Sequence, residues 1–425
     1  MLSKVKVCKD RDFAGKEPMK KLIQFWKNET VLCIALFLAV VSSVLVLPDR
    51  EYLGYIDFRT LAILFSLMSV MAGLQKIGLF QWIAERMLKR VRSAAQLVLI
   101  LVLLCFIFSM LITNDVALIT FVPFTFTVLG LLGEEQKRKL MIPIVAMQTI
   151  AANLGSMLTP VGNPQNLYLY GKAGLAVGEF LLLMLPYTLL ALAMLLLWCM
   201  GFAMFFRGNG RVKNDGDKAG QERKLGQESK SGQVSKSAQP LQISFAQQTS
   251  LRGRERALVA YLILFGVCLL VVAHVVPYIV ALLAVVAVVV LLDKKVLLQV
   301  DYSLLLTFVG FFVFIGNMGR IPVFSSFLQR VVEGNELWTA VISSQAISNV
   351  PAALLLSGFT SNYEALIVGT NLGGLGTLIA SMASLISYKF VARECGGRKG
   401  AYLFYFTVAN ICFLLPLVIL YRMIK

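Results

Sequence analysis

The stretch "ANLGSMLTPVGNPQN" (152–166) places two prolines, two glycines and three asparagines between apolar flanks. The preceding "KLMIPIVAMQTI" (139–150) has the composition of a membrane helix, and the following "LYLY" (167–170) remains apolar. Backbone N–H and C=O groups cannot be left open to lipid, so irregular backbone at that depth has to face protein or a water-filled cavity. The stretch therefore predicts a membrane helix that is broken to create binding groups.

The overall composition indicates a polytopic membrane protein. The chain has 425 residues, of which 58% are hydrophobic and 15% charged, whereas soluble domains are about 45–50% apolar and about 25% charged. Apolar runs at 31–48, 178–206, 257–292 and 401–421 approach or exceed the roughly 20 residues that a spanning helix needs. The first run begins at Val31 without a small-residue cleavage pattern, so no signal peptide is expected.

The net charge of +17 does not indicate nucleic-acid binding, because the basic residues lie in short loops between apolar runs. The seven cysteines are scattered singly, so neither a zinc site nor a disulfide framework is expected. The lipid bilayer is the predicted environment of the chain.

Two similar halves flank a polar segment. Residues 1–30 are predicted to form a cytoplasmic basic tail, and 207–256, rich in Gly, Ser, Gln and charge, a flexible cytoplasmic linker. The remaining parts, 31–206 and 257–425, share three landmarks in the same order. These landmarks are 56–80 matched with 300–324, "ITND" (112–115) with "ISNV" (347–350), and "ANLGS" (152–156) with "TNLGG" (370–374).

The predicted fold is an all-α polytopic membrane protein with about nine spanning helices, two re-entrant hairpins and two broken helices. The spans are expected at 31–48, 60–74, 140–170 (broken), 178–206, 257–276, 278–292, 302–318, 364–388 (broken) and 401–421. The limbs of the second hairpin, around "SNVP", have roughly 11 residues or ~16 Å, too short for a hydrocarbon core of about 30 Å.

The charge distribution predicts the orientation of the halves. Basic residues concentrate in loops that lie on one side when the N-terminus is cytoplasmic and the C-terminus outside, as the positive-inside rule expects. Five spans then separate Asp57 from its match Asp301, which puts the two on opposite faces. The halves are therefore predicted to be inverted repeats.

Glycines and prolines interrupt corresponding helices of the two halves, at Gly155, Pro160, Gly162 and Pro164 and at Gly369, Gly373, Gly374 and Gly376. Such paired interruptions are the best sequence indication of a secondary-transporter binding site. Half-helix N-termini present free N–H groups and a positive dipole end to an anion, and unwound carbonyls suit Na⁺. The alternative is a pair of kinked helices with packing glycines.

The hairpin tips carry hydroxyls, amides and one carboxylate. Hydroxyls and amides both donate and accept, so they could coordinate a cation or orient an oxyanion, with capping of the hairpin limbs as the alternative. A Na⁺ site is predicted as possible here, at Thr113, Asn114, Asp115, Ser348 and Asn349. An intramembrane carboxylate is costly and usually functional, so Asp115 could carry a coupling proton or help to hold Na⁺; its alternative role is an N-cap.

The tips and the breaks together make up the predicted substrate and ion site. Its residues are Thr113, Asn114, Asp115, Asn153, Gly155, Thr159, Gly162, Asn163, Asn166, Ser348, Asn349, Asn371, Gly373, Gly374, Thr377 and Ser381. No cofactor is expected beyond Na⁺ or H⁺ as the coupling ion.

The motifs "LITNDVALITFVPFTFT", "ANLGSMLTPVGNPQN", "SQAISNVPAALLL" and "TNLGGLGTLIASMASLI" resemble those of the ion transporter superfamily over 30–206 and 257–425. That group includes arsenite permeases, NhaD-type Na⁺/H⁺ antiporters, citrate transporters and divalent anion/Na⁺ symporters. The nearest likeness is to bacterial inner-membrane, citrate transporter-like anion permeases.

The resemblance implies a homodimer in which a transport domain moves against a scaffold by an elevator motion. It also implies that the tips (Thr113, Asn114; Ser348, Asn349) and the breaks (Asn153 to Asn166; Asn371 to Ser381) form the substrate and ion sites. Dicarboxylate symporters of the group carry Ser-Asn-Thr at both tips, whereas this chain has Thr-Asn-Asp and Ser-Asn-Val. The Asn-Asp tip is closer to the arsenite-permease pattern.

The expected function is secondary active transport of a small anion or oxyanion, such as citrate, a dicarboxylate or an arsenite-like species. It would take place across the cytoplasmic (inner) membrane, by symport with H⁺ or Na⁺. The alternative is a Na⁺/H⁺ antiporter with Asp115 as the exchanging carboxylate. A membrane-embedded enzyme is not expected, because the sequence has no second histidine, P-loop or HExxH motif. Inverted broken helices favour alternating access over a passive channel.

Overall fold

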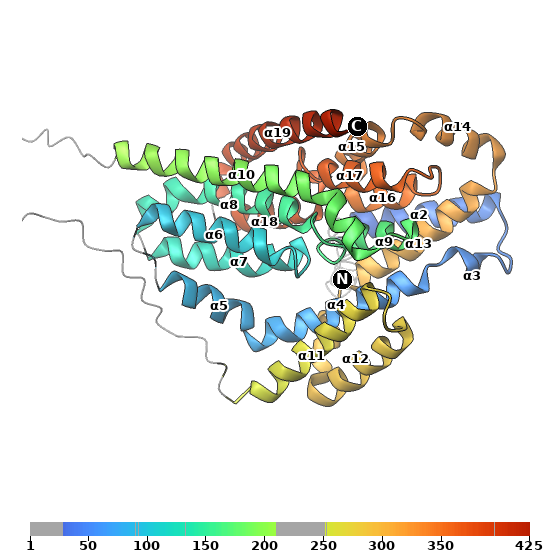
Figure 1. Cartoon of the computed structure of the whole chain (residues 1–425), viewed down its shortest axis with the longest axis horizontal. Helices are drawn as coiled ribbons and strands as arrows, with labels where there is room; N and C mark the ends of the chain where they lie inside the picture. The colour runs from blue at the N-terminus through green and yellow to red at the C-terminus, as the bar shows by residue number, and fades with distance from the viewer. Residues whose placement is uncertain are drawn as a thin grey trace, which may run out of the picture.

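The computed structural model describes residues 29–89, 91, 93–131, 133–209, 251, 253–394 and 396–425. Within these ranges every regular element is a helix (Figure 1), which confirms the predicted all-α class. Most of the predicted tail (1–30) and most of the predicted linker (207–256) lie outside the described residues.

The described residues of the first half of the chain form nine α-helices. They are α2 (Thr30–Leu45), α3 (Tyr52–Tyr55), α4 (Phe58–Ile77), α5 (Leu79–Leu88), α6 (Ala94–Phe108), α7 (Asn114–Gly130), α8 (Glu134–Ser156), α9 (Pro164–Ala173) and α10 (Val177–Asn209). The second half begins with α11 (Glu255–Val272), α12 (Tyr278–Asp293), the 3₁₀ helix η1 (Lys294–Gln299) and α13 (Tyr302–Gly319). It continues with α14 (Pro322–Val332), α15 (Glu336–Ile347), α16 (Asn349–Leu356), α17 (Tyr363–Gly373), η2 (Leu378–Ala380), α18 (Met382–Glu394), η3 (Gly396–Arg398) and α19 (Lys399–Ile424).

Five described helices are long and apolar enough to cross a membrane: Phe58–Ile77, Val177–Met204, Glu255–Val272, Tyr302–Gly319 and Lys399–Ile424. Each other predicted span also contains a helix, but α2 and α12 have only 16 residues each. At 1.5 Å per residue these two reach about 24 Å, somewhat less than the hydrocarbon core.

Helices α4 and α13 both begin after an aspartate that caps the first turn. Asp57 precedes α4 with φ −80° and ψ 83°, and Asp301 precedes α13 with φ −77° and ψ 82°. Each carboxylate accepts a hydrogen bond at 2.9 Å from a backbone N–H of the first turn, that of Thr60 or of Leu304. A side-chain acceptor at this position satisfies a donor that the helix leaves open.

Two helix pairs are joined by short turns. Helices α6 and α7 have 15 and 17 residues and are connected by 109–113, while α15 and α16 have 12 and 8 residues and are connected by Ser348 alone. The members of each pair pack against each other. The limbs of the second pair therefore reach only about 18 and 12 Å.

Both predicted helix breaks are present. The first separates α8 from α9 at 157–163, and the second separates α17 from α18 at 374–381. One part of the prediction is wrong, because Gly369 lies inside α17 and interrupts nothing. A Cβ at this position would lie 2.8 Å from Cβ of Ala340, so Gly369 instead lets α15 pack closely against α17.

The helices that follow the breaks cross into the other half of the chain. Helix α9 packs against α16 and α17, and α18 packs against α7 and α8. Figure 1 shows this exchange as the red α18 beside α7 and α8 of the first half. The exchange brings the two breaks and the two hairpin tips together at the centre of the bundle.

Charged residues connect helix ends at each end of the bundle. At one end Lys76 pairs with Asp293 at 2.5 Å, and at the opposite end of α4 Arg320 pairs with Asp49 at 2.6 Å. A third pair, Lys137 with Glu394, joins the start of α8 to the end of α18.

Candidate functional site

Each predicted hairpin tip is the N-terminus of a helix. Thr113 precedes α7 and Ser348 precedes α16, but neither side chain accepts a hydrogen bond from the helix it precedes. The alternative that these two residues serve as caps is therefore wrong. Ser348 has a positive φ of 75° and is only 3% exposed. A non-glycine residue in this region costs about 1–3 kcal/mol and is typical of functional sites.

One hydrogen-bonded chain runs from the first tip through the first broken helix to the second break. Asn114 Nδ2 donates to Asn153 Oδ1 at 2.9 Å, and Ser381 Oγ donates to the same oxygen at 3.1 Å. Asn153 Nδ2 lies 3.4 Å from both the carbonyl oxygen of Gly374 and Ser384 Oγ. The backbone N–H of Asn114 also donates to the carbonyl oxygen of Gly162 at 3.2 Å.

A second chain connects the two broken helices directly. Asn371 Nδ2 donates to Asn166 Oδ1 at 2.6 Å, and Asn163 Nδ2 lies 3.4 Å from Asn371 Oδ1. Asn163 also donates to Ser156 Oγ at 2.8 Å. All four side chains are buried, so this is a buried polar centre shared by both halves.

The second tip lies against the second break. A Cβ on Gly374 would approach Asn349 Nδ2 to 3.0 Å, so the glycine leaves room for this amide. Ser348 Oγ is 3.5 Å from the carbonyl oxygen of Ala380, just before Ser381. The structure thus brings Ser348 and Asn349 to the same region as Asn371 and Ser381.

The glycines of the site have two different roles. At Gly162 a Cβ would lie 2.1 Å from the carbonyl oxygen of Ser156, so the first break can fold back only with glycine there. At Gly155 and Gly373 the nearest groups would be the carbonyl oxygen of Phe106, at 2.0 Å, and Ser344 Oγ, at 2.6 Å. These two positions let each hairpin pack closely on its broken helix.

Two predicted residues lie at the edge of this centre. Thr159 is half-buried and donates to the carbonyl oxygen of Met110 at 2.5 Å. Thr377 is exposed, and its N–H and hydroxyl both bond to Gln345, at 2.9 and 3.2 Å. Both residues hold a break to a hairpin.

Three further residues of the centre, Gln345, Ser156 and Ser384, were not predicted from the sequence. Gln345 Nε2 donates to the carbonyl oxygens of Gly373 and Leu375, both at 2.9 Å, so it satisfies backbone that the second break opens. The sequence could have indicated this role, because Gln345 is a polar residue in an otherwise apolar hairpin limb, three residues before the tip at Ser348. Serines are common in membrane helices as backbone-bonding residues, so Ser156 and Ser384 carried no distinguishing pattern.

Some buried polar atoms near the centre have no hydrogen-bond partner in the described part of the protein. Among the described residues, the buried oxygens Asp115 Oδ1 and Asn163 Oδ1 and both polar atoms of the Gln165 side chain have no hydrogen-bond partner. Buried polar groups without partners are costly, so contact with a ligand or with water would stabilise these atoms. The described chain contains no cluster of three or more His, Cys, Asp or Glu that could hold a metal ion, so a cation here would depend on amide, hydroxyl and carbonyl oxygens and on Asp115.

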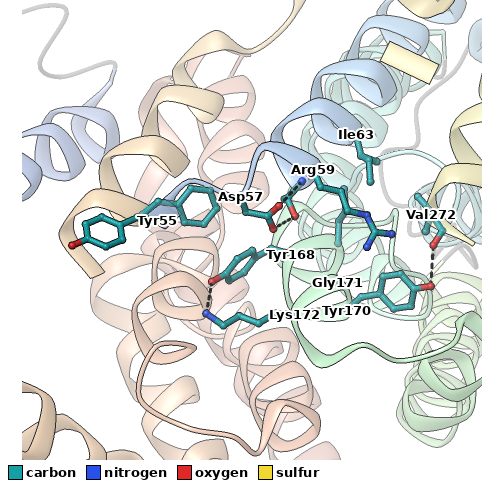
Figure 2. A pocket seen from close by; sticks show the side chains of 12 residues that line it. Tyr55, Asp57, Arg59, Ile63, Tyr168, Tyr170, Gly171, Lys172 and Val272 are labelled. Carbon is teal, nitrogen blue, oxygen red and sulfur yellow. Dashed lines mark hydrogen bonds between the residues drawn. The ribbon is translucent and has the colours of Figure 1, made fainter. Parts of the chain in front are cut away.

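Two cavities flank this centre. A cavity of about 290 Å³ reaches the second tip, and its lining includes Ser348, Glu29, Ser303 and Lys389. A pocket of about 240 Å³ is lined by the start of α4 and the end of α9, including Asp57, Arg59, Tyr168 and Lys172 (Figure 2). Helix α2 leads from Glu29 toward the loop before Tyr55, so the two spaces lie at opposite ends of the bundle.

Comparison with known proteins identifies a family and relatives that match about 80% of the chain. The family described as "Citrate transporter" matches residues 22–364. The chain is 30% identical over 348 residues to inner membrane protein YbiR of Escherichia coli. This alignment covers 80% of this chain and 82% of the relative. The chain is 28% identical over 344 residues to an uncharacterized transporter of Methanocaldococcus jannaschii, covering 81% of this chain and 84% of the relative.

A shorter similarity extends to a plant protein. Over 147 residues the chain is 31% identical to the silicon efflux transporter LSI3 of Oryza sativa. This alignment covers 34% of the chain and 29% of the relative.

Proposed function

Because this chain belongs to the citrate transporter family, we propose that it is a secondary active transporter of a small carboxylate or oxyanion. The family and the apolar helices make it a multi-pass membrane protein that transports anions. One observation carries the proposal of secondary active transport. Two helix breaks and two hairpin tips, from both halves of the chain, meet at one buried polar centre.

The helix ends at this centre suit an anion. Helices α7, α9, α16 and α18 all begin there, and helix N-termini carry open N–H groups and the positive end of the helix dipole. No lysine or arginine is among the buried residues of the described chain, so these dipoles and the asparagine amides supply the positive potential. Such a site favours a small anion whose oxygen atoms accept several hydrogen bonds.

Two substrate classes are compatible with this chemistry. The family description favours citrate or a smaller carboxylate. The name of the rice relative and the Asn-Asp tip favour a weak oxyacid, which needs fewer cationic groups. A direct comparison of substrates has to decide between the two classes.

An inverted repeat is supported by the lining of the two cavities. On α4, Arg59, Thr60 and Ile63 line the pocket, and their matches on α13 in the landmark alignment, Ser303, Leu304 and Thr307, line the cavity. When Asn153 is matched with Asn371, the α9 residues Leu167, Tyr168 and Gly171 correspond to Leu385, Ile386 and Lys389 of α18. Equivalent positions of the two halves thus build spaces at opposite ends of the bundle.

The two cavities differ in what they reach. The cavity touches Ser348 at the second tip, whereas the lining of the pocket includes neither Thr113 nor Asn114. We take this difference as one state of an alternating-access cycle, in which the centre is open toward the cavity. The same proposal includes a homodimer that works by an elevator motion and symport with H⁺ or Na⁺. It also places the N-terminus in the cytoplasm and the C-terminus outside.

A second candidate function is Na⁺/H⁺ antiport with Asp115 as the exchanging carboxylate. It is favoured by one specific observation, the buried Asp115 oxygen that has no partner among the described residues. In that case Na⁺ and H⁺ would compete for this carboxylate, with Thr113, Asn114, Ser348 and Asn349 supplying further oxygens.

Electrophysiology on solid-supported membranes with proteoliposomes tests the proposal. Citrate, succinate, sulfate and arsenite would be applied as concentration jumps, with and without Na⁺ and at several pH values. A saturable current for one substrate that requires Na⁺ or follows pH supports symport. Currents evoked by Na⁺ or pH jumps alone, indifferent to every anion, would support the antiporter instead. Flux that fails to saturate would indicate a channel.

A further inference from the structure

We propose that the pocket of about 240 Å³ between α4 and α9 is a second anion-binding site, built by Arg59 and Lys172. Its ligand is a small carboxylate or oxyanion, captured before it reaches the central site. The identity of this ligand with the transported anion rests on the proposed function, whereas the existence of the site does not.

Both cations of the pocket lack an ion-pair partner among the described residues. Neither Arg59 nor Lys172 forms an ion pair within the part of the chain that the structure describes. Ion pairs of the described chain are instead formed by Lys76, Lys137, Lys139 and Arg320. Two cations that line one pocket, neither of them in an ion pair, favour the binding of an anion there.

The carboxylate of the pocket, Asp57, is already hydrogen-bonded within its own helix start. Asp57 Oδ1 accepts from the backbone N–H of Thr60 at 2.9 Å, and Asp57 Oδ2 accepts from the Thr60 hydroxyl at 2.5 Å. Asp57 therefore starts α4 and leaves the Arg59 guanidinium free to bind another oxygen. The local charge of the three groups, two cations and one carboxylate, remains +1.

The walls of the pocket are held in place by their own hydrogen bonds (Figure 2). Tyr168 and Tyr170 use their hydroxyls, with the Tyr168 hydroxyl 2.8 Å from Ser357 Oγ and the Tyr170 hydroxyl donating to the carbonyl oxygen of Val272 at 2.9 Å. Lys172 Nζ donates to the Tyr168 hydroxyl at 3.3 Å and lies 5.7 Å from the centre of its ring. Two of the three ammonium hydrogens thus remain for a ligand, in addition to the guanidinium donors.

The size and position of the pocket fit a capture role. Its volume of about 240 Å³ accommodates several water molecules, each of which takes about 30 Å³ in the liquid, and hence a small carboxylate. Lys172 lies near the end of α9, and the start of this helix at Pro164 borders the polar centre. An anion held by Lys172 is therefore one short helix away from the proposed transport site, at the end of the bundle opposite the cavity that reaches Ser348.

Equilibrium binding of radiolabelled citrate to the full-length protein in nanodiscs tests this site, with sulfate as a second probe. Three double variants are compared with the parent. R59Q/K172Q removes the cations of the pocket, N349A/N371A removes the central amides, and R50Q/R330Q removes two exposed cations at the same end that do not line the pocket. A charge-conserving variant, R59K/K172R, separates loss of charge from a folding defect.

The expected result is that N349A/N371A retains binding of citrate or sulfate, and that adding R59Q/K172Q weakens this remaining binding at least about tenfold. R50Q/R330Q and R59K/K172R should stay within about threefold of the parent. The proposal would be overturned if N349A/N371A bound neither citrate nor sulfate. It would also be overturned if adding R59Q/K172Q to N349A/N371A left the remaining binding unchanged. If no anion is transported and N349A/N371A still binds a probe through Arg59 and Lys172, the proposed function fails and the second site stands.

Discussion

Asn371 donates a hydrogen bond to Asn166 across 2.6 Å, although the two residues are 205 positions apart in the chain. Each belongs to a different broken helix, and both side chains are buried. The bond exists because α9, which follows the first break, packs against α17, which precedes the second. It joins the two halves at the point where their irregular backbone meets.

Replacement of this amide should affect transport more than stability. Interhelical hydrogen bonds in membrane proteins contribute about 0.6 kcal/mol on average and up to roughly 2 kcal/mol, so N371A should unfold only slightly more easily. Its transport should fall by about tenfold or more, because a site hydrogen bond is lost and Asn166 is left without its partner.

The matched control for this variant is N317A. Asn317 is also fully buried, and its Nδ2 donates to Ser42 Oγ at 3.0 Å, away from the centre. Thermal unfolding and substrate currents of both variants would be measured in parallel. Equal transport by N371A and N317A would show that the hydrogen bonds of the centre are structural only.

Removal of the Asp115 charge should uncouple transport from its driving ion. D115N keeps the size of the side chain and removes both the titratable group and the negative charge. If Asp115 carries the coupling proton or helps to hold Na⁺, the anion current of D115N should persist or decline but lose its dependence on pH or Na⁺. The measurement is the current at several pH values and Na⁺ concentrations, with T159S as a control at the edge of the centre. An unchanged ion dependence in D115N would remove this residue from both candidate functions.

A methyl group at Gly162 should disrupt the first break. The new Cβ of G162A would lie 2.1 Å from the carbonyl oxygen of Ser156, so the backbone has to move. Overpacking of this kind costs about 1–3 kcal/mol, and the loss of the Asn114 contact to the Gly162 carbonyl should abolish transport.

G178A is the control for G162A, because no atom lies within 4 Å of a Cβ at Gly178 in α10. Alanine is favoured over glycine in a helix by about 1 kcal/mol or less, so G178A should be neutral or slightly stabilising. Thermal unfolding and transport of the two variants would be compared. A G162A protein that melts and transports like the parent would contradict the close approach at this break.

Acid should weaken the contact between the α2–α3 loop and α13. The Arg320 guanidinium, which donates to Asp49, holds the pKa of that carboxyl below its usual value. A carboxyl with a lowered pKa in the folded state stabilises it at pH values above the unfolded pKa of about 4, and this contribution is lost as the pH falls through the folded pKa. D49N should therefore melt at a lower temperature than the parent at pH 7, with the difference shrinking below pH of about 4.

E51Q provides the comparison for this effect. Glu51 lies 3.6 Å from Arg320 and is 69% exposed, so its removal should shift the melting temperature less than D49N does at pH 7. Differential scanning fluorimetry of the parent and both variants between pH 7 and pH 3 would measure this. A D49N difference that stays constant over that range would exclude the ion pair as its cause.

Much of the architecture followed from local patterns in the sequence. Long apolar runs indicated membrane helices, and clusters of glycine, proline and asparagine indicated the breaks at 157–163 and 374–381, because hydrophobic length and backbone conformation depend on neighbouring residues. The caps of α4 and α13 by Asp57 and Asp301 are equally local, although the sequence was used only to match these two aspartates between the halves.

The tertiary structure decided which of these local features meet. Gly369 had the same appearance in the sequence as Gly373, yet Gly373 ends α17 at the break, whereas Gly369 lies within the helix and packs against Ala340. Thr377 is exposed and bonds to Gln345, a residue that was not among the predicted site residues. The composition of a segment cannot reveal these differences, because they depend on which distant helix packs against it.

The crossing of α9 and α18 into the opposite halves is the decisive example. The sequence by itself determined that two breaks and two tips exist, since each is set by a few adjacent residues. Only the packing of α9 on α17 and of α18 on α7 placed Asn166 beside Asn371 and Asn153 beside Ser381. It also placed Lys172 and Arg59 in one pocket. Contacts between residues some 200 positions apart arise from the fit of whole helices, which no short stretch of sequence encodes.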